Sequence, residues 1–441
     1  MSDGPFGWVE STLGDLCEVV SGSTPRTGVP QYWGGDIPWI TPDDLSGYTR
    51  KTIAHGRRAL TQAGYDSCST RLVPAGTVLF TSRAPIGHVA IAAQRVCTNQ
   101  GFKSFVPSEA LTSDYLYWFL KFTTPQIRKL GSGTTFPELS KTRALEITIP
   151  VAPLNEQRRI VAAIEEQFSR LDAADESLRR AGAGLAGLRA STLFEALEGL
   201  PTATLGAVAA VNSGPAFKSE FFGASGEGIR LLRGENIEPG CLRWREVRTW
   251  PEAMLDGYEH LFVAETDLIL AMDRPVISSG LKLAPVRAQD LPALLVQRVA
   301  RIRPGERVVT RFLHLALQLP RFVPHLLGGQ TGTQLPHITL AGIRTFNVPS
   351  PPLEDQRRIV AEVEQRLSQI DALRAAIEAA QRRSAALRRS ILERAFRGEL
   401  VPQDPSDEPA SALLERIAAE RATAETANGG RPRRRATMQR S

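Results

Sequence analysis

A short glycine-rich stretch is the first place where this sequence could do chemistry. GAGLAG at residues 182–187 matches the GxGxxG pattern that holds a dinucleotide pyrophosphate. In nucleotide-binding proteins that pattern follows a strand, whereas here it lies within a stretch of helical periodicity. We therefore expect no cofactor there. The glycines instead favour close helix contact or a kink, at a cost of about 1 kcal/mol each relative to alanine.

Other catalytic signatures are missing from the sequence. It contains neither a GxxxxGK[ST] phosphate loop nor the Asn/Asp-Pro-Pro-aromatic tetrapeptide of adenine methyltransferases. The four cysteines form no CxxC pair, and the six histidines form no HExxH motif. We therefore expect a reduced protein that binds no metal and is not itself an enzyme.

Composition sets the class of protein. The chain has 441 residues, 42% hydrophobic and 23% charged, which predicts two or three globular domains. The apolar runs are far shorter than the roughly 18–20 residues of a membrane span, and MSDGPFGW does not resemble a secretory signal, so we expect a cytoplasmic protein. The net charge is +6, with 46 arginines and seven lysines. This balance permits nucleic-acid binding, although a GC-rich genome would also explain the arginines. The basic stretch at 428–441 is predicted to be a disordered tail.

The sequence repeats itself. PLNEQRRIVAAIEEQ at 153–167 and PLEDQRRIVAEVEQR at 352–366 lie 199 residues apart and match at nine of fifteen positions. TLGDLCEVVSG at 12–22 similarly parallels TLGAVAAVNSG at 204–214, with an offset of 192 residues. A repeat of this length indicates a duplicated domain rather than a solenoid unit.

Each half is predicted to be a variable body followed by a long helix. The bodies contain short β-rich runs and one helical patch each, which favours an α+β fold. From Leu154 and from Leu353 the apolar residues form a narrow stripe close to the 3.5-residue repeat of a coiled coil. The members of the first stripe are Ile160, Ile164, Phe168, Leu171, Leu178 and Leu185, and those of the second are Ile359, Val363, Leu367, Ile370, Ile377, Leu387 and Ile391. Two such helices of about 45 residues, roughly 65 Å long, would bury their stripes by packing on each other. On its own, the repeated QRRIVA is also explained by a solvated helix face with a buried Ile-Val edge.

These segments together resemble the specificity subunit of type I restriction-modification systems. The resemblance is carried by PLxxQRRIVA after each body, by the TLG…VxSG openings, by STPRTGVPQYWGGDIPWITPDDL at 23–45 and by RGELVPQDPSDEPASALLERI at 397–417. The second body lacks the YWGGDIPWI sequence of the first, so the DNA contacts implied by the resemblance transfer less well to the second body.

The resemblance implies an architecture and a set of partners. It implies two target-recognition domains (1–152 and 200–351), two antiparallel coiled-coil helices that separate them with pseudo-twofold symmetry (153–199 and 352–398), and a partner-docking C-terminal segment with a basic tail (399–441). It also implies a non-catalytic chain that reads a bipartite DNA target. Its partners would be two methyltransferase subunits that use S-adenosylmethionine, and restriction subunits where present.

Candidate DNA contacts are polar, basic or aromatic residues in loops next to the predicted strands, where side chains can reach base edges. For each one, surface solvation or core packing is the competing interpretation. The candidates in the first body are Arg26, Tyr32, Trp33, Thr81, Ser82, Arg83, Asn99, Gln100 and Lys103, and those in the second are Lys218, Arg233, Asn236, Arg274 and Lys282.

Two other classes of protein remain open at this stage. A coiled-coil scaffold that binds only proteins would explain the helices, but not two bodies with diverged loops. An enzyme with an unfamiliar site would need convergent titratable groups, and the sequence suggests none.

Overall fold

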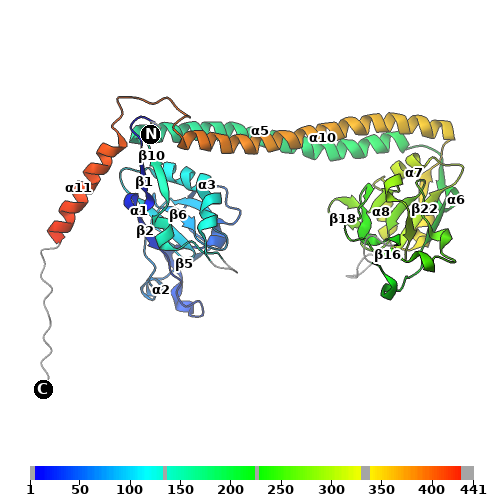
Figure 1. Ribbon diagram of the computed structural model, residues 1–441, viewed down its shortest axis with the longest axis horizontal. Helices are drawn as coiled ribbons and strands as arrows, with labels where there is room; N and C mark the ends of the chain where they lie inside the picture. The colour runs from blue at the N-terminus through cyan, green and yellow to red at the C-terminus, as the bar shows by residue number, and fades with distance from the viewer. Residues whose placement is uncertain (1–4, 133–136, 224–227, 329–337, 429–441) are drawn as a thin grey trace, which may run out of the picture. The chain divides into compact units, whose positions relative to one another are not determined.

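Two long helices begin where the repeated motif predicts. In this computed structural model, which describes residues 5–132, 137–223, 228–328 and 338–428 (side chains to 419), α5 spans Leu154–Leu197 and α10 spans Leu353–Phe396. Each helix follows a proline and carries acidic residues in its first turn, where the helix dipole stabilises negative charge. We call the residues before α5 body 1 and those between α5 and α10 body 2 (Figure 1). The basic tail predicted from residue 428 lies, from 429 on, outside the described residues.

The chain divides into two compact units, and each contains one body with parts of both long helices. Unit 1 comprises Met1–Glu176 and Gln381–Ser441, and unit 2 comprises Ser177–Ala380. In unit 1 the beginning of α5 packs with the end of α10, and in unit 2 the end of α5 packs with the beginning of α10. The predicted antiparallel pairing of the two helices is therefore confirmed within each unit.

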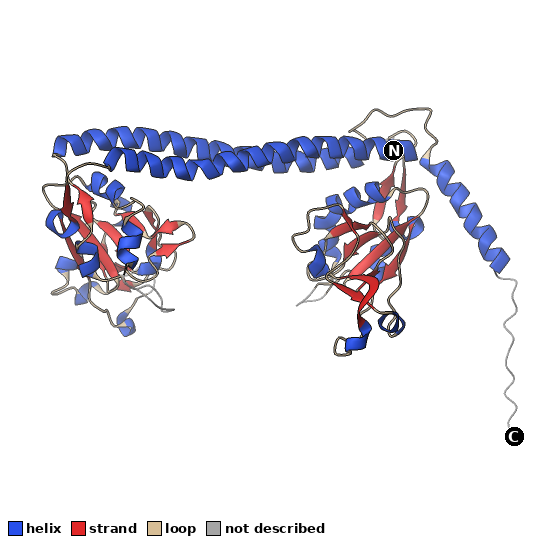
Figure 2. Cartoon of the chain, turned by 180° about the vertical axis from the view of Figure 1, so that it is seen from behind, coloured by secondary structure: helices blue, strands red, loops and turns tan. Residues whose placement is uncertain are grey.

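Body 1 is built on strands that pair antiparallel around Phe80 and Phe105, with α3 against β6 and β7 (Figure 2). Its main sheet has the order β2-β9-β6-β7-β4, its second sheet is β5-β3-β8, and β1 pairs with β10. The strands are β1 (Val9–Thr12), β2 (Cys17–Ser21), β3 (Trp33–Ile40), β4 (Thr52–Ile53), β5 (Arg58–Leu60), β6 (Val78–Thr81), β7 (Val89–Ala92), β8 (Cys97–Thr98), β9 (Phe102–Pro107) and β10 (Thr148–Val151). The helices are α1 (Leu13–Leu16), α2 (Gln62–Asp66), α3 (Ser113–Leu130) and α4 (Lys141–Leu145), with short 3-10 turns η1 (Pro30–Tyr32) and η2 (Pro42–Leu45).

Body 2 repeats this plan with shorter elements. Its main sheet has the order β12-β22-β17-β20, its second sheet is β16-β13-β21, and three further pairs are β11 with β23, β14 with β15 and β18 with β19. The strands are β11 (Thr202–Thr204), β12 (Ala209–Ser213), β13 (Ile229–Leu232), β14 (Ile237–Glu238), β15 (Cys241–Leu242), β16 (Thr249–Trp250), β17 (Leu268–Ala271), β18 (Val276–Ile277), β19 (Gly280–Leu281), β20 (Leu283–Pro285), β21 (Ala293–Leu295), β22 (Val299–Pro304) and β23 (Asn347–Pro349). The helices are α6 (Leu205–Val208), α7 (Thr310–Ala316), α8 (Phe322–Leu327) and α9 (Leu340–Arg344), with 3-10 turns η3 (Ser219–Phe221), η4 (Gly234–Asn236), η5 (Glu252–Met254), η6 (Glu259–Leu261) and η7 (Ala288–Asp290).

Individual hydrogen bonds are also repeated in the two halves of the chain. Gln157 is fully buried and bonds to the backbone of Thr112, Ala110 and Ala152 at 2.9 Å each. Gln356, which is 199 residues later, makes the equivalent bonds to Val309, Arg307 and Pro351 at 2.8–3.0 Å. In each unit this glutamine ties the first turn of a long helix to the loop before the helix of its own body.

An ion pair between the two long helices is repeated in the same way. In unit 1, Arg388 of α10 lies 2.8 Å from Asp172 and from Asp175 of α5. In unit 2, Arg189 of α5 lies 3.5 Å from Asp371 of α10. Arg189 and Arg388 are 199 residues apart, as are Asp172 and Asp371. The predicted α+β class with a duplicated body is therefore confirmed at the level of individual contacts.

The C-terminal segment folds back on unit 1. Leu400, Val401, Leu413, Leu414 and Ile417 pack against its hydrophobic core. The Arg159 guanidinium lies 2.7 Å from Asp407, whose side chain is almost fully buried. The last helix, α11, spans Ala410–Asn428. Residues 400–417 therefore pack on the chain's own core, and the docking of a partner by residues 399–441 stays a prediction.

Candidate nucleic-acid interface

The loop that follows β6 in body 1 is held in shape by Thr81. Its hydroxyl donates to the Pro85 carbonyl at 2.7 Å and accepts from the backbone N–H groups of Gly87 and His88 at 3.1 and 2.8 Å. The side chain is fully buried. Thr81 therefore shapes the 82–88 loop from within, and a direct base contact by Thr81 stays a prediction.

A charged cluster lies under the same loop. The Lys103 ammonium lies 3.5 Å from the Ser82 hydroxyl and 3.5 Å from the Glu138 carboxylate, and Arg83 lies 3.7 Å from that carboxylate. Lys103 and Ser82 are buried, whereas the side chains of Arg83 and Glu138 are 36% and 41% exposed. Burial lowers the pKa of Lys103, and Glu138 partly offsets this. Arg83 is thus the more exposed of the two cations of the cluster and the one that can reach an anionic or base-edge acceptor.

Asn99 and Gln100 form a turn that lies against this loop. The Asn99 side chain accepts from the Gly101 N–H at 2.8 Å, and the Gly101 carbonyl accepts from the Ser82 N–H at 2.7 Å. The exposed Gln100 accepts a hydrogen bond from Thr24. The structure therefore brings together Thr81, Ser82, Arg83, Asn99, Gln100 and Lys103, and contact of these residues with DNA stays a prediction.

Arg26, Tyr32 and Trp33 form a separate group in body 1. Arg26 is exposed, and Tyr32 ends η1 half-buried. Trp33 packs edge-to-face on Trp39 with ring centroids 5.0 Å apart, and the Arg58 guanidinium lies 3.4 Å above its ring. Trp33 thus has a packing role beside any role in binding.

Body 2 gathers four of its five candidates on two adjoining segments. Asn236 is buried, accepts from the Arg233 N–H at 3.0 Å and donates to the Arg243 carbonyl at 3.1 Å. The Lys282 ammonium donates to the Gly234 carbonyl, and the Lys282 N–H donates to the Pro275 carbonyl at 2.7 Å, next to Arg274. Burial lowers the pKa of Lys282, and the charge of Arg274 lowers it further.

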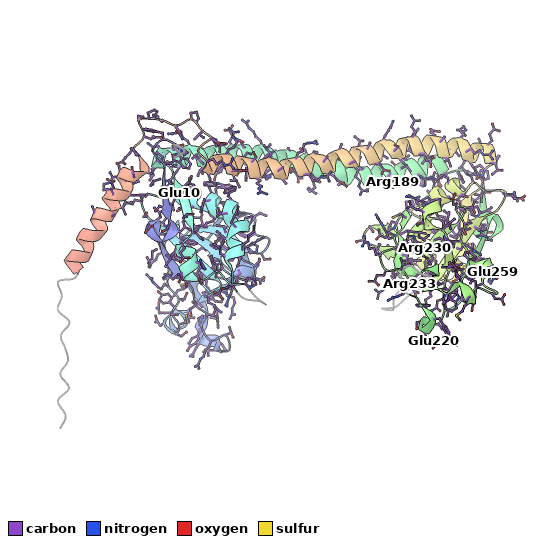
Figure 3. All side chains as sticks on the ribbon, in the orientation of Figure 1. Glu10, Arg189, Glu220, Arg230, Arg233 and Glu259 are labelled. Atoms are coloured by element: carbon purple, nitrogen blue, oxygen red, sulfur yellow. The ribbon has the colours of Figure 1, made fainter. Side chains whose placement is uncertain are left out.

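Arg233 and Lys218 differ strongly in their surroundings. Arg233 (Figure 3) pairs with Glu235, donates to the Glu246 carbonyl at 3.3 Å and keeps 27% of its side chain exposed. Burial lowers its pKa, and the nearby Arg248 adds to this. Lys218 is 76% exposed and lies 3.9 Å from Glu220.

Strained backbone marks the corresponding loop in both bodies. Ala84 after β6 has φ +50°, and Arg274 after β17 has φ +45°, and each residue precedes a proline. The left-handed region is uncommon for residues other than glycine and costs on the order of 1–3 kcal/mol. Such strain persists where surrounding structure enforces it, and it gathers at binding sites. We therefore take these two loops as the centres of the candidate interface.

Sequence reasoning missed three residues of these loops. Glu138 joins Arg83 to Lys103, and Asp273 accepts from Arg298 at 2.9 and 3.1 Å. Arg298 also has a left-handed backbone, with φ +60°. Arg298 precedes β22 as Gly101 precedes β9, and both carbonyls accept from the first residue after the neighbouring strand. A strand-by-strand alignment of the two halves would therefore have pointed to Arg298.

The described residues offer hydrogen-bonding groups but no metal ligands in a cluster. In residues 5–132, 137–223, 228–328 and 338–428, no group of three His, Cys, Asp or Glu side chains could hold a metal ion. Within the same ranges no helix is long and apolar enough to cross a membrane. The exposed Arg, Asn and Gln side chains are of the kinds that pair with guanine and adenine edges in the major groove.

Part of the chain resembles a known protein family. Residues 5–176 match the family model described as type I restriction modification DNA specificity domain. The chain is 43% identical over 162 residues to the type I restriction enzyme MjaIX specificity subunit of Methanocaldococcus jannaschii, covering 36% of this chain and 38% of that relative. It is 24% identical over 387 residues to the MjaVIII specificity subunit of the same organism, covering 84% of this chain and 87% of the relative.

Solved structures share the fold across most of the chain. A chain from a type I restriction-modification system, studied for complex assembly and conformational transition, superposes with a TM-score of 0.74 at 21% identity, covering 91% of this chain and all of that one. The HsdS subunit from Thermoanaerobacter tengcongensis superposes with a TM-score of 0.58 at 23% identity, with the same two coverages. At these identities the similarity concerns the fold alone.

Proposed function

We propose that this chain is a type I restriction-modification specificity subunit that reads a bipartite duplex DNA target, with one half-site for each body. The observation that carries this proposal is the pair of strained loops, one after β6 and one after β17, set in the same fold but lined by different residues. Loops of one geometry with different side chains are what two readers of different base sequences need.

The chemistry of the two loops supports different half-sites. Body 1 offers Arg83, Asn99 and Gln100, and arginine pairs well with guanine whereas asparagine and glutamine pair well with adenine. Body 2 offers Arg274 and the Asp273–Arg298 pair, and an aspartate carboxylate can accept from the cytosine amino group. The buried Lys103 and Asn236 would support these loops from below.

Exposed apolar side chains on the long helices support the binding of partner proteins there. In unit 2, Leu188, Phe194 and Leu373 are 48%, 51% and 52% exposed, and in unit 1, Leu387 is 49% exposed. A protein that covered these side chains would remove their apolar surface from water, which favours association. We propose that methyltransferase subunits dock there and that two of them bind per chain. In this proposal they hold S-adenosylmethionine, the chain itself is non-catalytic and works in the cytoplasm, and restriction subunits join where they are present.

Selection of bound sequences from random duplex DNA tests the proposed function. The full chain with its methyltransferase should select two short half-sites separated by a spacer of fixed length. Arg83→Gln should relax the preference at one half-site, and Arg274→Gln at the other, each by about 1–3 kcal/mol, or roughly 5- to 150-fold. Arg357→Gln, an exposed arginine of α10 outside both loops, is the matched control and should change neither. Binding without any sequence preference would contradict the proposal.

A further inference from the structure

Unit 2 contains a cavity whose lining is unusually rich in arginine. It has a volume of about 600 Å³ and lies among α5, α7, α10 and the β18–β19 hairpin. Its ionisable lining consists of Arg189, Arg287, Arg311, Arg374, His314 and a single carboxylate, Asp371. Arg189 lies on α5 (Figure 3). Four guanidinium groups around one carboxylate make this cavity strongly attractive to anions.

Two of these arginines, Arg189 and Arg311, are held in place by hydrogen bonds and ion pairs with neighbouring side chains. Arg189 donates to the Gln318 side chain at 3.3 Å and lies 3.5 Å from Asp371. Arg311 pairs with Glu364 and lies 3.1 Å from Nδ1 of His314. Burial, together with the charges of Arg311 and Arg189, lowers the pKa of His314 to about 4. His314 is therefore neutral at pH 7 and can accept from Arg311 without adding charge.

The other two arginines have no such anchoring. Arg287 and Arg374 are exposed, and neither forms an ion pair with any described residue. An unpaired guanidinium costs little in water, and a bound anion would find its donors free. The cavity is thus lined by two arginines that side chains of the protein hold and by two arginines without an ion-pair partner among the described residues.

The cavity adjoins the candidate DNA-contacting segments of body 2. Pro239, Gly240, Gly280 and Leu281 line one side of it. The Gly240 N–H donates to the Leu283 carbonyl at 2.8 Å, so this wall is continuous with Lys282 and the η4 turn that carries Asn236. A ligand in the cavity would lie beside the loops proposed to read bases.

We propose that this cavity binds phosphate-type oxyanions, supplied by the backbone of the bound DNA next to the body 2 half-site. Arginine suits this task because its planar donors match phosphate oxygens two at a time. Such contacts add affinity and fix register but carry no sequence information. This inference rests on the proposed function for the source of the phosphate, but not for the anion site itself.

The corresponding place in unit 1 differs in a way that provides a control. There a cavity of about 650 Å³ lies between α3 and the long helices, and Tyr117, Trp118, Phe122 and Phe168 line it together with cations and acids. Its Asp172–Arg388 pair corresponds to Asp371–Arg189 in unit 2. The shared fold therefore forms a cavity at both places, but the unit 1 cavity has two lining arginines, Arg388 and Arg389, where the unit 2 cavity has four. Arg389, which lines the unit 1 cavity and is exposed, is the matched control position.

The test compares the full chain, the double variant Arg287→Gln/Arg374→Gln and the control Arg389→Gln. One arm measures affinity for selected and scrambled duplexes between low and moderate salt. The double variant should weaken both duplexes by the same factor, about three- to tenfold, and reduce the slope of log K against log salt by about one or two. The other arm measures binding of inorganic pyrophosphate without DNA, which the double variant should weaken about tenfold. The variant Arg287→Lys/Arg374→Lys keeps both charges but not the paired planar donors, so it should keep the salt slope of the parent chain and recover only part of the pyrophosphate affinity.

Every outcome decides the question. A reduced salt slope supports the DNA backbone as the source of the phosphate. Loss of pyrophosphate binding with an unchanged slope supports the anion site but assigns it to a free phosphate compound. If both measurements match the parent chain, the inference is wrong. Absence of DNA binding by the parent chain would count against the proposed function, while the pyrophosphate arm would still test the site. Equal thermal midpoints of all variants, expected because Arg287 and Arg374 form no ion pairs, exclude a folding defect.

Discussion

Gln157 and Gln356 explain why the same motif occurs twice. Each buries its amide completely and satisfies one backbone N–H and two carbonyls at the start of a long helix. The neighbouring Ile160 and Ile359 are buried as the repeated motif predicts, while Arg158 and Arg357 are exposed. The solvated face with a buried edge is therefore correct for Arg158, Arg357 and the isoleucines, but it misses the glutamine and also Arg159, which pairs with the buried Asp407. The glutamine is the residue that joins helix to body.

Removing that glutamine should destabilise unit 2. Gln356→Ala leaves the Val309 N–H and the Arg307 and Pro351 carbonyls without their partner, and a buried unsatisfied group costs about 1–3 kcal/mol. We expect a loss of about 3 kcal/mol in the free energy of unfolding, measured by urea denaturation. Gln365→Ala, an exposed glutamine of the same helix, is the control and should change it by less than about 0.5 kcal/mol. Equal losses for the two variants would contradict the assigned role.

His314 should make unit 2 sensitive to acid. Its pKa is lowered to about 4 in the folded chain, from 6.5, so on acidification the unfolded chain takes up the proton first. The stability that the neutral imidazole contributes above pH 6.5 is thus lost as the pH falls toward 4, by at most about 3 kcal/mol. His314→Gln should flatten this part of the curve of unfolding free energy against pH. The exposed His260→Gln is the control, and parallel curves for His314→Gln and the parent chain would contradict the prediction.

The sequence predicted the loops that carry the candidate residues better than it predicted which of their side chains are exposed. Arg83, Gln100 and Arg274 lie in exposed or half-exposed positions, whereas Ser82, Lys103 and Asn236 are buried. The difference depends on partners that are distant in sequence. Lys103 is covered because β9 pairs with β6 and because Glu138 returns from 35 residues further along the chain. Spacing along one strand contains no information about such neighbours.

At the scale of elements, the predicted stripe on α10 is correct for most of its length. Ile359, Val363, Leu367, Ile370 and Ile391 are buried, but the predicted member Leu387 is 49% exposed. The reason is register, because the position seven residues after Ile377 is 384 rather than 387. Ser384 occupies the helix interface there, is buried and donates to Asp175 at 3.0 Å. Because this interface position is occupied by a polar residue, a search for apolar periodicity does not detect it.

The glycines of α5 lead to a prediction about the stability of that helix. A Cβ at Gly182 would contact only Ile377 at 3.9 Å, and a Cβ at Gly184 or Gly187 would meet nothing within 4 Å. Helical glycine costs about 0.5–1 kcal/mol relative to alanine, so Gly184→Ala and Gly187→Ala should each stabilise the helix by that amount. The measurement is the midpoint of thermal unfolding followed by helical circular dichroism. Gly22→Ala is the opposite control, because its Cβ would lie 2.1 Å from the Thr98 carbonyl oxygen and should destabilise.

At the scale of the whole chain, the internal repeat suggests that a second copy of residues 1–199 could take the place of the second half of the chain. Residues 1–199 alone would leave the beginning of α5 without Ile391, Leu392, Ala395 and Phe396 of α10. The residues 199 positions earlier are Thr192, Leu193, Ala196 and Leu197, at the end of α5 itself. A second copy of the half-chain, running antiparallel, would bring those residues to the vacated surface. The substitution of Thr192 for Ile391 and of Leu197 for Phe396 makes this interface smaller and more polar than the native one.

The same register also transfers an ion pair. Arg388 corresponds to Arg189, so in a dimer of half-chains Arg189 of one copy would reach Asp172 of the other, and the pair would occur twice. Asp172→Arg should therefore break the dimer by placing like charges together, and adding Arg189→Asp in the same chain should restore it. If neither the single nor the double variant forms a dimer, the proposed alignment of the two α5 helices is wrong.

We therefore expect the half-chain to dimerise at micromolar concentration and to bind an interrupted palindrome. Each buried apolar side chain contributes about 1.5–3 kcal/mol, against an association cost of about 4–15 kcal/mol, so several such residues from each copy suffice for a weak dimer. A twofold dimer presents two identical bodies to DNA in opposite orientations, so both arms should be the half-site read by body 1. Sedimentation followed by selection from random duplexes measures both steps. A persistent monomer would show that the contacts made only by α10, above all those of Phe396, are indispensable. A dimer that selects an asymmetric site would show that the two bodies do not read DNA independently.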